Sequence, residues 1–202
     1  MKNIVKFTLV PIQKITKREI IEAARQVFTK QGYHKTTMND IAEVCGIQKG
    51  SLYHHFKGKE ELMKAAIDSF HHKFKEGAFN LFENTTLSTQ EKLNKLIDFS
   101  EKTYLADEGS MMASIVLETI NVVPGIVESI RSFFNDWIDS VSKILEEVYE
   151  PDGARKIAKE SIAAVEGAVM MMQIFNDTSF LTRVHEGMRR RVAADIKEAA
   201  SI

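Results

Sequence analysis

The side chains best suited to chemistry in this 202-residue chain are hydrogen-bond donors concentrated between positions 48 and 54. If a helix begins near Gln48, Leu52 and Phe56 lie one turn apart and face inward, which leaves a polar face toward solvent. That face carries Gln48, Lys49, Ser51, Tyr53 and His54. Lysine and glutamine can hydrogen-bond the edges of guanine and adenine, and the other groups can donate to phosphate oxygens. The predicted chemistry is recognition of duplex DNA.

A short preceding helix is expected to position this polar face. Thr37 and Asp40 have the spacing of a capping box, in which a hydroxyl and a carboxylate bond the free amides at a helix start. Gly46 can adopt the left-handed backbone that closes a helix, so the first helix ends there. Residues 36–56 therefore predict a helix-turn-helix, whose second helix enters the major groove.

A further helix must support these two, because helices this short bury too little surface to be stable alone. Thr16 and Glu19 repeat the capping-box pattern, and we expect the supporting helix to begin there and to end at Gly32. Its apolar residues recur at helical spacing and form a buried stripe of Ile20, Ala24, Val27 and Phe28.

Composition favours an all-α protein, because three prolines and ten glycines are few and long stretches are rich in helix-forming residues. We expect a three-helix helix-turn-helix domain, then a larger helical domain, with about nine helices in all. The assigned segments are a flexible arm at residues 1–15, the DNA-binding domain at 16–60 and the larger helical domain at 61–202. The arm is interpreted as a frayed tail in preference to a minor-groove contact.

Charge is divided unevenly along the chain. Of the 27 Lys and Arg residues, 11 lie in residues 1–60 beside 5 Asp and Glu, which leaves 16 basic and 23 acidic residues for the rest. A basic N-terminal part joined to an acidic body is typical of a protein that contacts phosphate with one end. A single cysteine and the lack of a long apolar run favour a cytoplasmic protein that does not enter a membrane.

Two final helices are expected from residue 154 to 176 and from 178 to 200. The first carries small residues at helical spacing, which allow close approach of another helix: Ala163, Ala164, Gly167 and Ala168. Surplus apolar surface on a terminal helix pair predicts a homodimer through these last two helices, closed as a four-helix bundle.

The N-terminal third resembles the TetR family of bacterial transcriptional regulators. The resemblance covers roughly residues 17–65 and rests on several fixed spacings: Ala23-Ala24-x-x-Val27-Phe28-x-x-x-Gly32-Tyr33, Thr36-Thr37-x-x-x-Ile41-Ala42, and Gly46-Ile47-x-Lys49-Gly50-Ser51-Leu52-Tyr53-x-x-Phe56-x-x-Lys59-Glu60-x-Leu62. Gln48 departs from the family pattern, in which Ser or Thr is more common, so the recognition helix is expected to lack its usual side-chain cap.

The resemblance implies a role for each matching position. Thr37 would contact phosphate, the residues from Gln48 to Ser51 would face base edges and backbone, and Tyr53, His54 and Lys59 would hold phosphates. The candidate DNA contacts are Lys17, Thr36, Thr37, Gln48, Lys49, Gly50, Ser51, Tyr53, His54 and Lys59. The family resemblance also implies that the larger helical domain, residues 61–202, is a regulatory, ligand-binding and dimerisation domain that binds a small effector.

Methionine and aromatic residues of the C-terminal part can line an apolar pocket, although each is also a reasonable core residue. Polar candidates that would orient a ligand are Glu118, Asn121 and Gln173. Besides Asn121, the candidate ligand-binding residues are Met111, Met112, Ile115, Glu118, Phe133, Phe134, Trp137, Met171, Gln173 and Phe175.

Other chemistry has little support in the sequence. Adjacent histidines such as His54 and His55 point about 100° apart on a helix, so they predict no metal site. Cys45 is interpreted as a small buried residue, and Arg189 to Arg191 as a solvated face. We expect no cofactor and no enzymatic activity. The favoured hypothesis is a repressor that binds a palindromic operator and is released by a small apolar or amphipathic ligand; the alternative is a DNA-binding regulator or architectural protein controlled by a protein partner.

Overall fold

The computed structural model describes residues 15–106, 110–119 and 123–199, and every regular element in these ranges is helical. Residues 1–14 of the predicted arm and Asn121 lie outside the described residues, whereas Ile15 is partly buried against the core. In chain order the elements are α1 (Lys17–Lys35), α2 (Met38–Val44), α3 (Lys49–His55), α4 (Lys59–Gly77), the 3-10 helix η1 (Phe79–Glu83), α5 (Thr89–Leu105), α6 (Ser110–Thr119), α7 (Pro124–Leu145), α8 (Pro151–Phe175) and α9 (Ser179–Ala199). The all-α prediction and the expected helix number are confirmed for this part of the chain.

Capping boxes begin three of these helices, and the sequence analysis predicts the first two. In each box the side chain of the capping residue accepts a hydrogen bond from an amide three residues on, and the acidic side chain there accepts one from the capping amide. The pairs are Thr16 with Glu19 in α1, Thr37 with Asp40 in α2, and Ser88 with Glu91 in α5. Each cap contributes about 0.5–2 kcal/mol, enough to fix where a short helix such as α2 begins.

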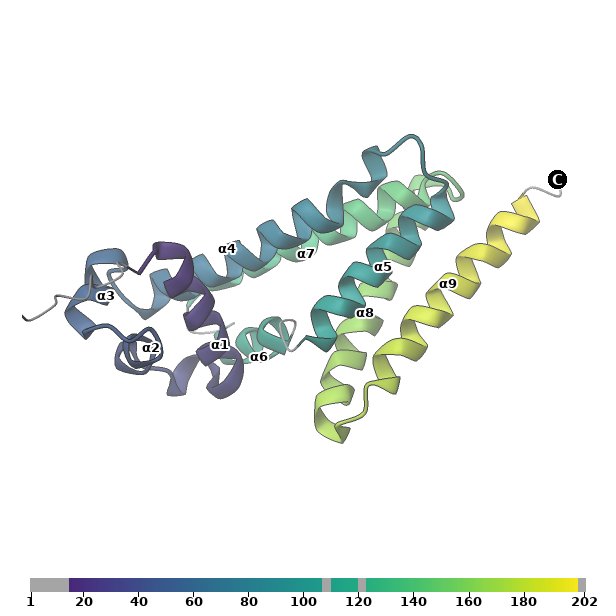
Figure 1. The fold of residues 1–202 in the computed structure, drawn as a ribbon. Helices are drawn as coiled ribbons and strands as arrows, with labels where there is room; N and C mark the ends of the chain where they lie inside the picture. The colour runs from purple at the N-terminus through teal and green to yellow at the C-terminus, as the bar shows by residue number, and fades with distance from the viewer. Residues whose placement is uncertain (1–14, 107–109, 120–122, 200–202) are drawn as a thin grey trace, which may run out of the picture.

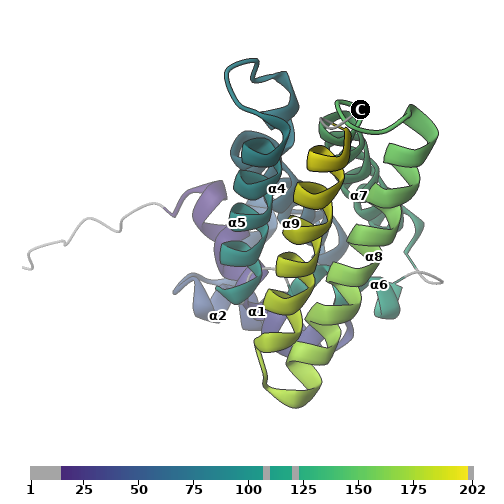
Figure 2. The same cartoon turned by 90° about the vertical axis from the view of Figure 1, so that its right-hand side faces the viewer.

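The helices form a head and a body (Figure 1). The head consists of α1, α2 and α3 at one end of the molecule, and α4 runs from it along α7 into the body. At the far end α9 packs against both α5 and α8, and Figure 2 shows it between them. The short helix α6 packs against α1, so the head meets the body through α6 as well as through α4.

Aromatic rings make up the centre of the body. Phe133 of α7 is fully buried, and its ring centroid lies 5.4 Å from that of Phe70 and 5.2 Å from that of Phe74. Phe79 of η1 lies 5.8 Å away and Trp137 5.7 Å. These tilted and edge-on contacts join α4, η1 and α7 into one rigid unit.

Helix boundaries differ from the predictions at two points. Gly32, expected to end α1, has a φ of 79° and a short helical segment continues beyond it to Lys35. The helix expected from residue 154 begins at Pro151, because the missing amide hydrogen of proline is not needed in the first turn of a helix. None of the described helices has the length and apolar character to cross a membrane.

Candidate nucleic-acid interface and internal cavity

The outer face of α3 presents the donors that the sequence predicts. Leu52 and Phe56 are buried under the helix, whereas Gln48, Lys49, Gly50, Ser51, Tyr53 and His54 are exposed. Gln48 is the N-cap of α3 and its side chain makes no capping hydrogen bond, as its departure from the family pattern implies. Its amide is therefore available to read a base edge.

The turn before α3 is fixed by backbone bonds. Gly46 has a φ of 64°, its amide donates to the Glu43 carbonyl at 3.0 Å, and the Ile47 amide donates to the Ala42 carbonyl at 3.0 Å. This pattern closes α2 and directs the chain into α3. Cys45 lies half-buried in the turn, and burial raises the pKa of its thiol, so the sulfur is protonated at neutral pH. Among the described residues no three His, Cys, Asp or Glu side chains gather to hold a metal.

Two further candidate DNA contacts, Thr36 and Lys59, make hydrogen bonds within the head, and a third, Lys17, lies near an aromatic ring. Thr36 is buried, and its hydroxyl donates to the Gly32 carbonyl at 2.6 Å. The Lys59 ammonium donates to the Tyr33 carbonyl at 2.7 Å and lies 4.4 Å from the centroid of the Tyr33 ring. Lys17 is exposed, with its ammonium 4.9 Å from the Phe56 ring centroid. The structure thus gives Thr36 and Lys59 internal partners, and their contact with phosphate stays a prediction.

Glu118 connects α6 to the head. Its carboxylate accepts a hydrogen bond from the His34 amide at 2.8 Å, and its carbonyl lies 3.0 Å from the Nε2 atom of His34. A side chain at Gly32 would bring a Cβ within 2.2 Å of the same carboxylate. The sequence analysis predicts that Glu118 orients a ligand. In the structure its carboxylate accepts a hydrogen bond from the His34 amide near the end of α1. The sequence does not indicate this contact, because the two residues are 84 positions apart.

A partly enclosed cavity of about 240 Å³ lies in the body. Its walls come from α5, α7, α8 and α9 and are mostly apolar, with Leu96, Val141, Ile162 and Met188 among them. Of the predicted ligand contacts, Trp137 belongs to this lining.

The other predicted ligand contacts lie elsewhere. Met112, Ile115 and Phe133 are fully buried, and Phe134 is half-buried and stacks on Trp137. Met171 is half-buried, Gln173 is exposed, and Phe175 is 60% exposed at the end of α8. Met111 belongs to α6, but its side chain is outside the described part of the structure. None of these residues is part of the cavity lining, so a ligand role for them stays a prediction.

Several residues that line this cavity carry a buried polar atom without a hydrogen-bond partner in the described structure. Five buried side-chain atoms lack a hydrogen-bond partner among the described residues, and three of them belong to lining residues: Ser100 Oγ, Trp137 Nε1 and His185 Nδ1. Leaving one such group unpaired costs about 1–3 kcal/mol, so three at one cavity need an explanation. The sequence analysis did not single out Ser100 and His185. Each is a polar residue within an apolar helical stripe, but a polar core residue with a hydrogen-bond partner gives the same pattern.

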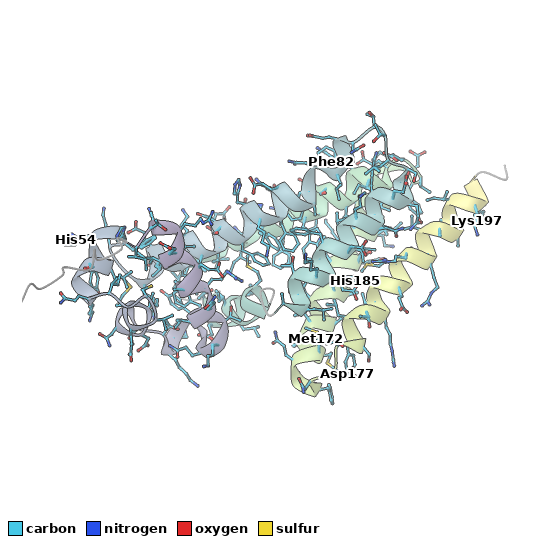
Figure 3. All side chains as sticks on the ribbon, viewed as in Figure 1. His54, Phe82, Met172, Asp177, His185 and Lys197 are labelled. Carbon is cyan, nitrogen blue, oxygen red and sulfur yellow. The ribbon has the colours of Figure 1, made fainter. Side chains whose placement is uncertain are left out.

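His185 extends from α9 toward the helices that it packs against (Figure 3). The Glu101 carboxylate lies 3.6 Å from its Nδ1 atom, which is too far for a hydrogen bond. Burial, together with the Arg189 cation, lowers the pKa of His185 to about 4, although Asp98 opposes the change. The imidazole is therefore neutral at pH 7.

Comparisons with known proteins cover both the head and the body. The family model described as "Bacterial regulatory proteins, tetR family" matches residues 20–66, and that of "Transcriptional regulator LmrA/YxaF-like, C-terminal domain" matches residues 89–187. The HTH-type transcriptional regulator TtgR of Pseudomonas putida is 48% identical over 56 residues, only 28% of this chain and 27% of TtgR. The HTH-type transcriptional repressor DhaR of a Mycobacterium species is 22% identical over 182 residues, 85% of this chain and 91% of DhaR.

Solved structures share the whole fold. A TetR transcriptional regulator from Legionella pneumophila superposes with a TM-score of 0.80 at 25% identity, covering 90% of this chain and 99% of that one. A TetR-family regulator from Agrobacterium tumefaciens gives a TM-score of 0.76 at 24% identity, over 90% and 98% of the two chains. With a TetR match on the head, a regulator match on the body and this shared fold, the chain belongs to the TetR family of bacterial transcriptional regulators and is not an enzyme.

Proposed function

We propose that this regulator is a repressor that binds a palindromic operator as a homodimer and releases it when a small, mainly apolar molecule enters the cavity. The observation that carries the proposal is the exposed, donor-rich face of α3, held in position by the buried Leu52 and Phe56. A helix with this character suits the major groove. Such a protein acts where the operator is, in the cytoplasm.

The proposed contacts divide by chemistry. Gln48 and Lys49 read base edges, and Gly50 lets the backbone of α3 approach the DNA closely. Hydroxyl, imidazole and ammonium groups around them bind phosphates and set the register on the duplex, namely Lys17, Thr36, Thr37, Ser51, Tyr53, His54 and Lys59. For Thr36 and Lys59 this contact requires that the bonds within the head rearrange or that their backbone amides take part.

A second copy of the chain is proposed to cover the end of α8. Large apolar side chains are exposed there, with Met170 at 47%, Ile174 at 65% and Phe175 at 60%. One turn or more earlier, Ala163 and Ala164 are exposed small residues that allow a helix to approach closely. These observations support pairing of α8 and α9 with the same helices of a partner, which would set the spacing of the two α3 helices.

Replacing Lys49 by alanine tests the reading helix. In vitro selection should first yield a palindromic sequence, and we then expect Lys49→Ala to weaken its binding about tenfold to a hundredfold by fluorescence anisotropy. Lys95→Ala, an exposed lysine of α5, is the matched control and should bind normally. An equal loss on random DNA would reduce Lys49 to a phosphate contact, and failure to select any palindrome would contradict the proposed function.

Replacing Glu118 by alanine tests the connection between α6 and the head. The His34 amide would lose its acceptor, so its segment should open more readily. We expect amide hydrogen exchange of the peptide that contains residues 32–35 to quicken about tenfold, measured by mass spectrometry. Glu128→Ala, an exposed glutamate of α7, should leave this exchange unchanged. Unchanged exchange in Glu118→Ala would show that this contact does not hold the head.

A further inference from the structure

The cavity is large enough for more than one ring. A cavity of about 150 Å³ in a protein core holds benzene, and the volume here is about 240 Å³. Aliphatic side chains from four helices line most of it. Size and lining therefore suit a compact bicyclic molecule.

Two of the described residues that line the cavity carry buried hydrogen-bond donors without a partner among the others. The indole of Trp137, 2% exposed, can only donate, so whatever completes it must accept. Ser100, 1% exposed, can donate or accept, and its Oγ atom is also unpaired in the described structure. Two buried donors on one apolar cavity call for a molecule with an accepting oxygen.

Charge is unfavourable inside. The unpaired groups belong to neutral side chains, since His185 is uncharged at pH 7. The charged lining residues, Glu160 and Arg191, are exposed and of opposite sign, so together they favour neither an anion nor a cation. An ionised ligand would lose its hydration without gaining a buried partner of opposite charge.

We propose that the cavity takes an uncharged bicyclic molecule with a hydrogen-bond-accepting carbonyl or ether oxygen, bound by the Trp137 indole and the Ser100 hydroxyl. Only one part of this proposal rests on the proposed function, namely that the molecule bound in the cavity is the effector. His185, which also lines the cavity, contributes a third polar atom, Nδ1, that is unpaired among the described residues.

Three saturated bicyclic probes test the chemistry. They are 2-decalone, which is uncharged and accepts hydrogen bonds, decahydro-2-naphthoate, an anion, and decahydro-2-naphthylamine, a cation at pH 7. We expect 2-decalone to bind one site per chain by isothermal titration calorimetry, at least tenfold more tightly than either ion. Because Trp137 is the single tryptophan of the chain, its fluorescence should change on binding.

Two conservative variants test the assigned partners. Trp137→Phe and Ser100→Ala should each weaken 2-decalone about fivefold to tenfold, the loss expected for one hydrogen bond. Ser132→Ala, an exposed serine of α7, is the matched control. Thermal melting shows whether either variant has lost its fold. If one of them has, the binding of 2-decalone by the other variant is the test. Tighter binding of either ion, no binding of 2-decalone, or binding that neither variant alters would overturn the proposal.

The role as effector site is tested separately. If 2-decalone binds as expected and lowers the affinity for the selected operator, both the site chemistry and the effector role are supported. If it binds with the expected variant effects but leaves operator affinity unchanged, the site chemistry stands and the effector role fails. If operator binding is intact and 2-decalone does not bind, water alone occupies the cavity and only the proposal fails.

Discussion

Replacing Phe133 by alanine is expected to lower the free energy of unfolding by about 3–5 kcal/mol, the usual cost of removing a fully buried phenyl ring. Phe133 has no exposed surface, and the ring contacts α4, η1 and the following turn of α7. The space left by the ring cannot be filled easily, because Phe70, Phe74 and Trp137 are held by one another. Urea denaturation followed by circular dichroism measures the loss.

The matched control for this experiment is Leu117→Ala in α6. Leu117 is 78% exposed, so its removal should change the free energy of unfolding by no more than about 0.5 kcal/mol. All proteins must be compared at one concentration, since a proposed dimer makes stability depend on it. A loss below about 1 kcal/mol for Phe133→Ala would mean that the aromatic cluster repacks.

Replacing Glu166 by glutamine should stabilise the protein above neutral pH. The Glu166 carboxyl lies against the buried Tyr104 hydroxyl, which donates to it. Burial raises the pKa of Glu166 to about 7, against an ordinary value of 4.5, although the Tyr104 bond acts in the opposite direction. Because the folded-state pKa is raised, the native protein holds this proton where the unfolded chain has lost it.

The contribution of Glu166 is therefore fully present below pH 4.5 and is lost as the pH rises through about 7. Glutamine keeps an acceptor for Tyr104 without the charge. We expect Glu166→Gln to exceed the wild type at pH 8 by up to about 3 kcal/mol, with the difference shrinking toward pH 5. Urea midpoints at four pH values between 5 and 8 measure this.

Other titrating groups cancel in that comparison. The lowered pKa of His185 makes the protein less stable as the pH falls from about 6.5 through about 4, but it does so in the wild type and in Glu166→Gln alike. Glu160→Gln, at an exposed position on the same helix, is the matched control. A difference between Glu166→Gln and the wild type that does not vary with pH would contradict the assigned burial of the Glu166 charge.

The head was predictable because its signals are local. A capping box joins residues three apart, so Thr37 with Asp40 marks the start of α2 from sequence alone. Gly46 marks the turn for the same reason, since its positive φ is a property of one residue. The apolar spacing of Leu52 and Phe56 then predicts which face of α3 is exposed, and the structure confirms it.

The cavity was not predictable, because a cavity is space that packed helices leave unfilled. Apolar periodicity predicts that Phe133 and Trp137 both face inward. It does not distinguish them, although only Trp137 lines the cavity. Glu118 and Lys59 show the same limit for polar groups. Their partners, His34 and Tyr33, lie 84 and 26 residues away, and such pairs follow from how helices meet in space.

The continuity of α4 has a mechanical consequence. This helix of 19 residues begins at Lys59 beside the head and holds Phe70 and Phe74 in the aromatic cluster, so no joint separates the two ends. At 1.5 Å per residue the part of α4 between Lys59 and the cluster is about 16–22 Å long, so a tilt of about 5° at the cluster displaces the Lys59 end by about 1.5–2 Å. In a symmetric pair the two displacements add or subtract, so a rearrangement too small to disturb the core would still alter the fit to a duplex whose grooves repeat about every 34 Å.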